Sequence, residues 1–468
     1  MKLALPQIAR WLPAELETGA DSIAATGYSI DSRTLHPGDL FFAIHGERFD
    51  GHDFLGAAFE RGACAAVVAR SRLAALPEAA KTKPLLAVDD PLAALQRLAA
   101  AVRRHWGKRV IGITGSAGKT TTKEAVAAVL AARFQVLKSQ GNLNNGYGLP
   151  LQLLRLEPAH EVAVIEMGMS AAGEIAALCR IAAPDWGVVT NVGHAHAEGF
   201  ADGVAGIARA KYELVAALPR HGVAFLNCDD PYVSQFGRGF EGKAIYFGRG
   251  PCAEPRAESV QALGADGLRI RIRAGEQHTD LALHLPGEHN ASNALAATAV
   301  GLEAGIPLAA CCAALEQLRP EDKRGQVIHI NGATLINDSY NSNPEALQSM
   351  IATLKSMPAT RRILVAGEML ELGPEAAALH TACGKAAAGI DIVVGVRGNA
   401  SHIVDAAQTV GAHALFIESL EAAGAWLREN LQPGDAVLLK ASRGVRLERA
   451  LDGLMPPQKD PGSHSPAR

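Results

Sequence analysis

Residues 110–121 read VIGITGSAGKTT, and no other part of the chain indicates the fold as clearly. The apolar first half is typical of a buried strand, and residues 122–133 have the composition of a helix. Between them, glycines let backbone N–H groups approach phosphate oxygens, and the start of the helix adds positive potential. The order of strand, glycine-rich loop and helix predicts a phosphate-binding loop of the shorter GxxGKT form; the alternative is a chance turn before a helix.

The residues of this loop have distinct expected roles in binding ATP. The loop backbone would surround the phosphates, Lys119 would reach the terminal phosphates, and Thr120 would ligate Mg²⁺. We therefore predict an ATP site made by Gly115, Ser116, Ala117, Gly118, Lys119, Thr120 and Thr121.

Two further strand ends carry side chains suited to magnesium. Residues 162–165 predict a buried strand that ends in Glu166, whose carboxylate would face the phosphate loop and ligate Mg²⁺; the alternative is a surface glutamate. Another predicted strand, residues 187–191, is followed by His194 and His196. Zinc is excluded because no third ligand stands at a suitable spacing. We expect His194 to bind a second Mg²⁺ and His196 to be a polar loop residue.

Two other segments carry polar residues whose role the local pattern leaves open. Residues 142–150 contain Asn144 and Asn145, whose amides could hold a substrate or a nucleotide phosphate. Such a segment equally often forms a turn in which side chains cap their own backbone. Lys211 lies in a predicted alanine-rich helix, where a lysine usually belongs to a solvated face.

The pattern of strands and helices divides the chain into three α/β domains. With 468 residues, the chain exceeds what one hydrophobic core usually supports. We predict a small mixed α/β module at residues 1–84, a central ATP-binding domain with a mainly parallel sheet at 85–318, and a Rossmann-like α/β domain at 319–455. The site should lie at the carboxyl ends of the parallel strands. Residues 456–468 are rich in Pro, Gly and Ser, and we expect them to be disordered.

Composition and charge exclude several classes of protein. A formal net charge of -3 argues against a sequence-independent nucleic-acid binder. No apolar run approaches the roughly 18 residues needed to cross a bilayer, and Pro and charged residues interrupt the N-terminal segment too often for a secretory signal. The 7 cysteines include no CxxC pair, so we expect reduced thiols. The composition therefore predicts a cytoplasmic protein that acts on small molecules.

The order of the motifs along the chain resembles that of the ATP-dependent Mur ligases of peptidoglycan synthesis, within the wider group that includes folylpolyglutamate synthetase. The segments that carry the resemblance are TGSAGKTT from Thr114, NNGYGLP from Asn144, the strand-end Glu166, TNVGHAH from Thr190, ARAKYEL from Ala208 and GEHNASNALAA from Gly287. The likeness covers nearly the whole chain and ends before the proline-rich tail. Together these motifs are far more specific than any one of them.

Motifs near the two ends of the chain show which members of the family it resembles. Residues 30–33 (IDSR) and 37–52 are similar to the UDP-sugar module of the tripeptide-adding and dipeptide-adding members, which the folate enzymes lack. Residues 337–344 (NDSYNSNP) and 366–373 (AGEMLELG) resemble the dipeptide-adding members specifically. Many of these relatives have an aspartate where this chain has Glu368, a difference at the place where the second substrate would dock.

The resemblance implies a ligase that joins D-alanyl-D-alanine to the peptide carboxylate of UDP-N-acetylmuramoyl-tripeptide. In the family scheme, that carboxylate attacks the γ-phosphate of ATP, and the dipeptide amine then displaces phosphate from the resulting acyl phosphate. Lys119 and two Mg²⁺ ions would offset the phosphate charge. By the same resemblance, Thr120 would bind one ion, and Glu166 and His194 the other.

The resemblance also assigns residues outside the phosphate loop. Lys211 would carry a carbamate that ligates the second Mg²⁺; the alternative is an ammonium that pairs with Glu213 or contacts phosphate. Arg324 would act in catalysis by closing over the phosphates from the C-terminal domain; the alternative is that it belongs to an exposed charge cluster, residues 321–325, at a domain linker. The remaining expected contacts are Asn290 and Asn293 with adenine, Asp338 with ribose, Ser32 and Arg33 with the UDP-sugar, Asn144 and Asn145 with a substrate, and Asn341, Lys440 and Ser442 with the dipeptide.

Two other classes of function remain open from the sequence. A small-molecule kinase would also use the phosphate loop, but it would not need a UDP-sugar module or additional α/β domains. A nucleotide-driven switch would hydrolyse ATP without an amine acceptor. We expect a monomer, and the third residue of the tripeptide can be either diaminopimelate or lysine.

Overall fold

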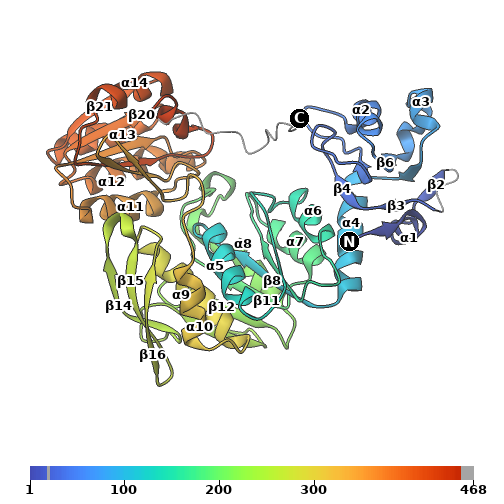
Figure 1. Cartoon of the computed structure of the whole chain (residues 1–468), viewed down its shortest axis with the longest axis horizontal. Coiled ribbons are helices and arrows are strands. Elements are labelled where there is room, and N and C mark those ends of the chain that lie inside the picture. Colours follow the sequence, from blue (N-terminus) through green and yellow to red (C-terminus); the bar gives the residue numbers. More distant parts are fainter. Residues whose placement is uncertain (18–21, 455–468) are drawn as a thin grey trace, which may run out of the picture.

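The computed structural model describes residues 1–17 and 22–454 and contains three α/β lobes. Figure 1 shows the N-terminal lobe, in blue, and the C-terminal lobe, in orange and red, on opposite sides of the central lobe. The α/β architecture expected from the sequence is confirmed. The tail predicted for residues 456–468 lies outside the described residues.

The N-terminal lobe is built around a five-stranded sheet. Its helices and strands are β1 (Leu3–Ala4), α1 (Leu5–Trp11), β2 (Glu15–Glu17), β3 (Ala24–Ala25), β4 (Gly27–Ser29), β5 (Asp39–Phe42), α2 (Leu55–Glu60), β6 (Ala65–Ala69), α3 (Glu78–Lys81) and β7 (Leu85–Val88). The sheet order is β2-β7-β6-β5-β4, with β4 to β7 parallel. Because β7 pairs with β6, this sheet extends past the boundary predicted after residue 84. Helix α4 (Pro91–Trp106) then leads into the central lobe.

The central lobe contains the parallel sheet that carries the phosphate loop. Its elements are β8 (Arg109–Thr114), α5 (Lys119–Ala131), β9 (Val136–Lys138), α6 (Gly148–Leu154), β10 (Val162–Glu166), α7 (Glu174–Ala182), β11 (Trp186–Val189), α8 (Gly203–Ala216), β12 (Val223–Asn227) and β13 (Lys243–Phe247). The strands are parallel in the order β13-β12-β11-β8-β10-β9. The carboxyl ends of β8, β10 and β11 therefore meet at one edge, as the sequence predicted.

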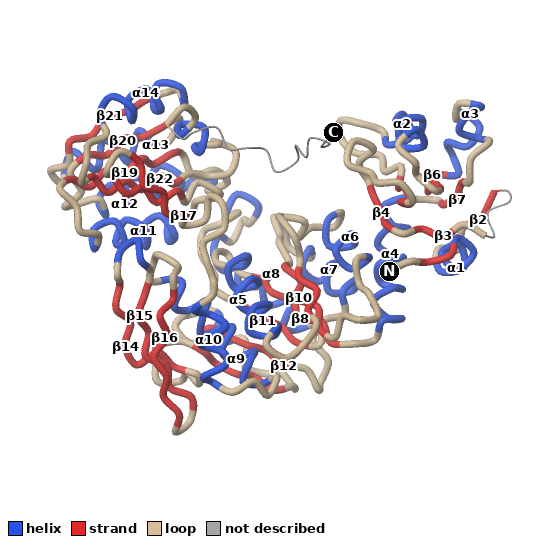
Figure 2. Tube along the Cα trace, in the orientation of Figure 1, coloured by secondary structure: helices blue, strands red, loops and turns tan. Residues whose placement is uncertain are grey.

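An antiparallel sheet of three strands follows, and the sequence predictions did not include it. The elements of this region are β14 (Arg256–Ala262), β15 (Leu268–Ala274), β16 (Gln277–Leu283), α9 (His289–Glu303) and α10 (Leu308–Glu316). Figure 2 shows the sheet as long red strands beside α9 and α10. The alternation of apolar and charged residues in LRIRIRA, residues 268–274, is the signal of a strand with one buried face. Ile270 and Ile272 supply that buried face.

The C-terminal lobe is a second mainly parallel α/β unit. Its elements are β17 (Gln326–Ile330), β18 (Ala333–Asn337), α11 (Pro344–Ser356), β19 (Arg361–Gly367), α12 (Ala376–Ala386), β20 (Ile392–Val396), α13 (Ala400–Thr409), β21 (His413–Ile417), α14 (Leu420–Asn430) and β22 (Asp435–Lys440). The sheet order is β17-β18-β22-β19-β20-β21, with β17 antiparallel to β18. The parallel strands β18, β22, β19, β20 and β21, with the helices between them, agree with the Rossmann-like α/β domain predicted for this region.

Buried apolar side chains cover both faces of the central sheet. On one face, Leu98 of α4, Leu178 of α7 and Leu214 of α8 belong to a cluster that continues into the N-terminal lobe. On the other face, Leu130 of α5 and Leu295 of α9 belong to a second cluster, which includes the antiparallel sheet. Close packing of this kind holds the strand ends, and the loops that follow them, in fixed positions.

The structure joins Cys228 and Cys252 in a disulfide, with 6.0 Å between their Cα atoms. The prediction that every cysteine is a reduced thiol is wrong for this pair. The two residues are 24 positions apart, and the chain returns because the Cys228 N–H donates to the Phe247 carbonyl at 2.8 Å. Spacing alone does not show such a return, because it depends on the pairing of β12 with β13.

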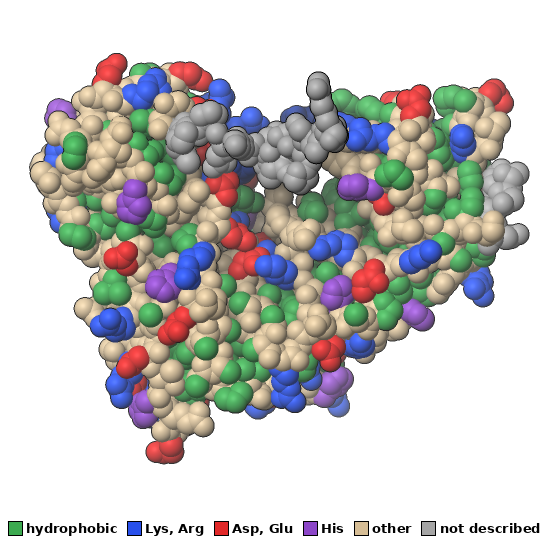
Figure 3. Space-filling model, viewed as in Figure 1, with side chains coloured by type: hydrophobic (Ala, Val, Ile, Leu, Met, Phe, Trp, Pro, Cys, Tyr) green, Lys and Arg blue, Asp and Glu red, His purple; other side chains and the backbone are tan. Residues whose placement is uncertain are grey.

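The surface agrees with the small net charge of the sequence. On the face drawn in Figure 3, basic and acidic side chains are interspersed over all three lobes. Within residues 1–17 and 22–454, no helix has the length and apolar character needed to span a membrane.

Candidate active site

The phosphate loop connects β8 to α5 and depends on two glycines. Gly115 has a φ of +154°, and a Cβ at this position would lie 1.8 Å from the Thr190 hydroxyl oxygen. Gly118, at the N-cap of α5, has a left-handed φ of +79°, and a Cβ there would lie 2.5 Å from the Asn293 side-chain oxygen. A side chain at either position would therefore displace the loop. With Gly118 as the cap, α5 begins at Lys119 and not at the predicted residue 122.

Residues that follow β11 hold the loop in place. The Thr190 hydroxyl donates to the Ala117 carbonyl at 2.6 Å. The Asn191 amide group accepts from the Ala117 N–H at 2.8 Å and donates to the Ala117 carbonyl at 3.1 Å. The Ser116 hydroxyl donates to the Gly193 carbonyl at 3.1 Å and accepts from the Gly193 N–H at 2.9 Å. The loop is therefore ordered at the N-terminus of α5, where an anion is favoured, before any ligand binds.

Lys119 carries the positive charge of the loop. Its ammonium donates to the Gly115 carbonyl at 2.7 Å, and no ion pair with a carboxylate is present among the described residues. Burial lowers the pKa of Lys119; the Glu166 carboxylate opposes this shift, and the Arg324 guanidinium adds to it. A desolvated cation beside a second cation is stabilised when an anion binds. The position of Lys119 thus suits its predicted role with phosphate.

Thr120, Glu166 and Asn144 form a hydrogen-bonded group beside the loop. The Thr120 hydroxyl donates to Glu166 Oε2 at 2.9 Å, and Asn144 Nδ2 donates to Glu166 Oε1 at 2.8 Å. Glu166 is buried, and its carboxylate faces the loop instead of forming part of the surface. The Asn145 side chain instead accepts from the N–H of Gly148, the first residue of α6, at 2.9 Å. The structure therefore separates the two asparagines that the sequence treated together.

The oxygens of Thr120 and Glu166 fit a magnesium ion. Adjacent ligands of an octahedral Mg²⁺ lie about 3.0 Å apart when each metal–oxygen distance is about 2.1 Å. The separation of these two oxygens is 2.9 Å. The described part of the chain contains no group of three or more His, Cys, Asp or Glu side chains that could hold a metal ion. A magnesium ion here would therefore need additional oxygens from a bound phosphate.

Lys211 lies on α8 and is buried, with a relative exposure of 1%. Desolvation, followed by the nearby charge of Lys119, lowers its pKa well below the ordinary value. The carboxylate of Glu213 accepts from the N–H groups of Gly173 and Ala176 at 2.7 and 2.9 Å, so it caps α7. Within the part of the chain that the structure describes, Lys211 forms no salt bridge with Glu213, the partner considered for it from the sequence. Lys211 is thus a buried amine and not part of a solvated helix face.

The two histidines of the segment after β11 face different neighbours. His194 Nδ1 lies 2.6 Å from Glu345 Oε1, and His194 Nε2 lies 3.9 Å from Glu375 Oε2. Both ring nitrogens of His194 therefore face carboxylates of the C-terminal lobe. His196 forms an ion pair with Glu371 through Nδ1. Burial lowers the pKa of His196; Glu371 opposes this shift, whereas the ammonium groups of Lys119 and Lys211 reinforce it.

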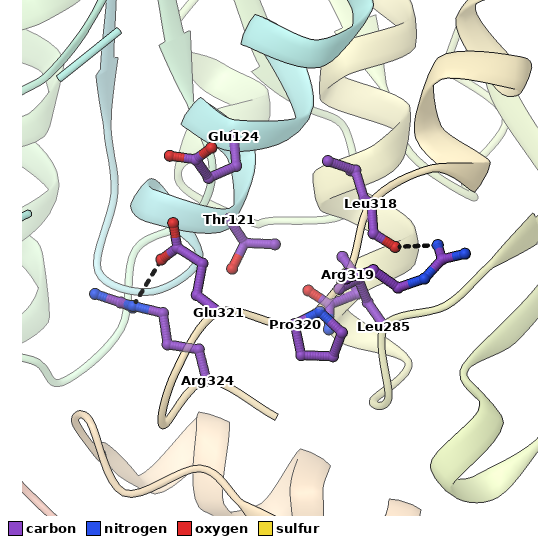
Figure 4. Close-up of a pocket in the computed structure, with 9 residues that line it drawn as sticks. Thr121, Glu124, Leu285, Leu318, Arg319, Pro320, Glu321 and Arg324 are labelled. Carbon is purple, nitrogen blue, oxygen red and sulfur yellow. Dashed lines mark hydrogen bonds and ion pairs between the residues drawn. The ribbon is translucent and has the colours of Figure 1, made fainter. Parts of the chain in front are cut away.

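A pocket lies between α5 and the linker that leads into the C-terminal lobe (Figure 4). Its lining residues are Thr121, Glu124, Leu285, Asn290, Leu318, Arg319, Pro320, Glu321 and Arg324. Arg324 Nε lies 3.5 Å from Glu321 Oε2, and the guanidinium carbon lies 3.7 Å from the centre of the Tyr340 ring. The structure therefore brings Arg324 of the linker close to the phosphate-loop helix, although the two are far apart in the sequence.

Asn290 of α9 lines this pocket, and Asn293 lies three residues further along the same helix; the amides of both bond to the protein. Asn290 Nδ2 donates to the Pro286 carbonyl at 2.8 Å, and Asn293 Nδ2 donates to Asn290 Oδ1 at 2.8 Å. The Thr122 hydroxyl donates to Asn293 Oδ1 at 3.0 Å. The two asparagines thus tie α9 to α5, and their contact with adenine remains a prediction.

The structure also brings together the residues predicted to bind the dipeptide. Lys440, at the end of β22, pairs with Asp338 and donates to the Asn341 carbonyl at 3.0 Å. The Ser442 hydroxyl accepts from the Leu370 N–H at 2.9 Å. Because Asp338 already balances the charge of Lys440, a dipeptide carboxylate would have to compete with this ion pair.

Three other positions considered for substrate binding have local contacts. Ser32 is buried in the N-terminal lobe, whereas Arg33 is exposed and pairs with Asp31 at 2.7 Å. Glu368 accepts from the backbone and side chain of Asn399, at 3.1 and 2.8 Å, just before α13 begins. The carboxylate at position 368 therefore stabilises the start of α13.

Models of three Mur ligase domains match the chain in sequence order. The Mur ligase family catalytic domain matches residues 24–103, the Mur ligase middle domain matches 113–301, and the Mur ligase glutamate ligase domain matches 323–443. Together with the curated relatives, these matches settle the family. The chain belongs to the Mur ligase family.

Relatives within the family are similar over nearly their full length. A UDP-N-acetylmuramoyl-tripeptide–D-alanyl-D-alanine ligase of Bacillus subtilis is 36% identical over 92% of this chain and 93% of its own. A crystal structure of MurF from Acinetobacter baumannii has a TM-score of 0.87 at 28% identity and covers 97% of this chain and 99% of its own. MurF ligase from Thermotoga maritima in complex with ADP has a TM-score of 0.79 at 27% identity and covers 92% and 96%. The three-lobe fold is therefore that of the Mur ligases.

Sequence reasoning missed the residues of the C-terminal lobe that contact the central lobe. Glu345, Glu371 and Tyr340 stand within the two quoted motifs of that lobe, residues 337–344 and 366–373, or directly after one of them. Nothing in their local pattern indicates that two of them face histidines and the third stacks on Arg324. The same contacts decide which of His194 and His196 has a ring nitrogen that could bind a metal ion.

Proposed function

We propose that this Mur ligase joins D-alanyl-D-alanine to the peptide carboxylate of a UDP-N-acetylmuramoyl-tripeptide and converts ATP to ADP and phosphate. The curated relative from Bacillus subtilis carries the name of this activity. The observation that carries the proposal is the 2.9 Å contact of Thr120 with Glu166 beside the phosphate loop, which suits magnesium-bound ATP. In the proposal, the enzyme is a cytoplasmic monomer.

The chain's own groups would bind and align the reactants. A carboxylate and an amine do not condense in neutral water, so the carboxylate must first be activated as an acyl phosphate. Lys119, Arg324 and the N-terminus of α5 would offset the charge that develops on the transferred phosphoryl group. Docking of the C-terminal lobe would exclude water, which would otherwise hydrolyse the acyl phosphate.

Magnesium is the cation that these residues fit, and it would neutralise phosphate charge when bound. Thr120 and Glu166 would provide two of its oxygen ligands. For a second ion, the contacts favour His196 over His194. Both ring nitrogens of His194 face carboxylates, whereas His196 is paired through Nδ1 alone. We therefore place the expected histidine ligand at His196.

We further infer that Lys211 carries a carbamate. Its neutral amine would attack CO₂, form an N–C bond and release a proton, so that a cation is replaced by an anionic group. The burial and lowered pKa of Lys211 support this step, because only the neutral amine is nucleophilic. An unmodified ammonium would repel a second magnesium ion. Glu213, the competing partner, is engaged in capping α7.

The remaining predicted contacts complete the proposal. Asn290 and Asn293 would bind adenine and Asp338 the ribose, each after giving up part of its present hydrogen bonding. Ser32 and Arg33 would bind the UDP-sugar. Asn144 would contact the substrate beside Glu166, and Asn145 would contribute by ordering the loop that holds Asn144. The dipeptide would be bound by Asn341, Lys440 and Ser442. In this assignment the three substrates meet between the lobes.

Product analysis tests the proposal directly. The purified enzyme would be incubated with ATP, Mg²⁺, D-alanyl-D-alanine and a UDP-N-acetylmuramoyl-tripeptide ending in either diaminopimelate or lysine, and the products identified by mass spectrometry. We expect UDP-N-acetylmuramoyl-pentapeptide from one or both tripeptides. Phosphate release should require both co-substrates. A kinase would transfer the phosphoryl group to one co-substrate and release ADP without free phosphate, and a switch would release phosphate with neither co-substrate. Repeated turnover with phosphate release in the absence of the dipeptide would therefore refute the proposal.

A further inference from the structure

Cys228 and Cys252 lie beyond the carboxyl ends of two neighbouring strands, β12 and β13. Cys228 directly follows β12, whose last residue pairs with the last residue of β13. Cys252 lies in residues 248–255, the β13–β14 loop. The disulfide therefore ties the β13–β14 loop to the end of β12. It does so at the edge of the same sheet that carries the phosphate loop.

The neighbours of Cys228 are fixed, whereas Cys252 is open to solvent. Asn227, the last residue of β12, is buried, and its Nδ2 donates to the Thr190 carbonyl at 2.8 Å. Thr190 in turn holds the phosphate loop through its hydroxyl. Cys228 is half-buried and Cys252 is exposed. Small thiols and disulfides in solution can therefore reach this pair, and exposed disulfides are the ones most readily reduced.

The β13–β14 loop also contacts the helix that borders the nucleotide pocket. Arg249 Nη1 donates to Glu288 Oε2 at 3.1 Å, and Glu288 is the N-cap residue of α9. Asn290, in the first turn of α9, lines the pocket beside the phosphate-loop helix. Because the disulfide limits the movement of the loop, it also limits the movement of the cation that pairs with the start of α9.

The other five cysteines are free thiols in less accessible places. Four of them are buried and Cys64 is half-buried. Burial raises the pKa of the Cys179 thiol to about 12 and that of the Cys64 thiol to about 11. The thiolate is the nucleophile in disulfide exchange, so thiols of this kind react slowly. Accessibility therefore directs redox chemistry to Cys228 and Cys252.

We propose that Cys228 and Cys252 are a reversible thiol–disulfide site that adjusts how tightly the enzyme binds its nucleotide. This inference rests on the proposed function, which places the enzyme in the cytoplasm and gives it ATP as a substrate. Cytoplasmic thiols keep most accessible disulfides reduced, so the bond forms when the surroundings become oxidising. Oxidation then stabilises the pair of Arg249 with Glu288 at the start of α9, and reduction loosens it.

The reaction needs a low-molecular-weight disulfide as the oxidant. The Cys252 thiolate attacks one sulfur of that disulfide, which forms a mixed disulfide and releases one small thiolate. The Cys228 thiolate then attacks the Cys252 sulfur and releases the second small thiolate. The two protons lost by the protein thiols are taken up by the two small thiolates. Two protein thiols and one small disulfide thus become one protein disulfide and two small thiols, and a thiol reductant reverses the reaction.

The expected change in nucleotide affinity is modest. The Asp229 carboxylate accepts from the N–H groups of Arg249 and Gly250, at 2.7 Å each, so the loop remains partly held after reduction. The side chains of Arg249 and Glu288 are 50% and 53% exposed, and an exposed ion pair changes an equilibrium constant by at most about fivefold. We therefore expect the oxidised enzyme to bind ADP about two- to fivefold more tightly than the reduced enzyme.

The test compares the full chain after equilibration with oxidised or reduced glutathione. Once glutathione is removed, a thiol-reactive dye in denaturant should find seven thiols in the reduced protein and five in the oxidised protein. Calorimetric titration with ADP and Mg²⁺ should show the difference in affinity. Cys228→Ser and Cys252→Ser should bind ADP like the reduced wild type in both conditions. Cys64→Ser is the matched control and should keep the full response.

Arg249→Ala separates formation of the bond from its effect on the nucleotide site. This variant should still form the disulfide but lose the difference in ADP affinity. Seven thiols in the oxidised wild type would overturn the inference. Equal ADP affinity of the two wild-type forms, or an unchanged difference in Arg249→Ala, would overturn it as well. If the wild type fails to ligate the dipeptide, the proposed function falls, while the thiol count and the ADP titrations still decide this inference.

Discussion

Replacing Thr120 with valine removes one hydroxyl and leaves the shape of the side chain nearly unchanged. The lost hydrogen bond, 2.9 Å to Glu166 Oε2, has a charged acceptor. Such bonds contribute about 1.5 to 3 kcal/mol to stability. The other oxygen of Glu166 keeps its bond from Asn144 at 2.8 Å, so we expect the free energy of unfolding to fall by only about 1 to 2 kcal/mol. That loss is too small to unfold a typical domain.

The expected effect on catalysis is larger. Removing one group that stabilises transition-state charge typically costs about 3 kcal/mol, or roughly 100-fold in rate. Phosphate release would be measured with both co-substrates over a range of Mg²⁺ concentrations, and thermal melting would report the fold. Thr120→Ser keeps the hydroxyl and should retain most of the activity. A folded Thr120→Val enzyme with wild-type kcat/KM for ATP would refute the assignment of Thr120 to magnesium.

Three further predictions concern the other cations and the movement of the lobes. Lys119→Ala should lower turnover by at least about 100-fold without changing the melting temperature greatly; comparable ligation by the folded variant would contradict the phosphate-loop assignment. Small-angle scattering should show compaction with an ATP analogue and the UDP-tripeptide, because Arg324 and Lys119 belong to different lobes, and an unchanged radius of gyration in all ligand states would count against closure. Lys211→Ala should lose activity and recover part of it with a short carboxylic acid. Recovery with an alkylamine alone would show that the native group is an ammonium.

The phosphate loop could be predicted because its chemistry is local. Strand β8, the glycines and Lys119 follow one another in the chain, so their pattern predicts their arrangement. Glu166 could be predicted for a related reason, since parallel strands end at one edge of a sheet. The antiparallel strands β14 to β16 were missed although their alternation was visible. The boundary after residue 84 differs from the end of the N-terminal sheet, because β7 pairs with β6 and not with the central sheet.

Contacts between lobes could not be predicted, because they depend on how separate domains dock. His194 and His196 stand two residues apart with similar neighbours, and only the positions of Glu345, Glu371 and Glu375 distinguish them. The pairing of Cys228 with Cys252 is similar, since it depends on the parallel pairing of β12 with β13, whose carboxyl ends the two residues follow. The pairing of Lys440 with Asp338 was likewise invisible, because it joins the ends of β22 and β18 across 102 residues.

The site brings three cationic side chains near one another, Lys119, Lys211 and Arg324, and nearby carboxylates balance only part of their charge. Burial lowers the pKa of Lys119, and the charge of Arg324 adds to this shift. Burial and the charge of Lys119 together lower the pKa of Lys211. Like charges brought together in this way oppose docking of the lobes while no ligand is bound. A polyphosphate would reverse that effect, because it adds several negative charges among the same cations. A carbamate on Lys211 would remove one of the cations altogether. The repulsion between the cations is therefore offset only when the nucleotide is bound. Closure of the lobes then depends on the same nucleotide that forms the acyl phosphate, which is the species that must be protected from water.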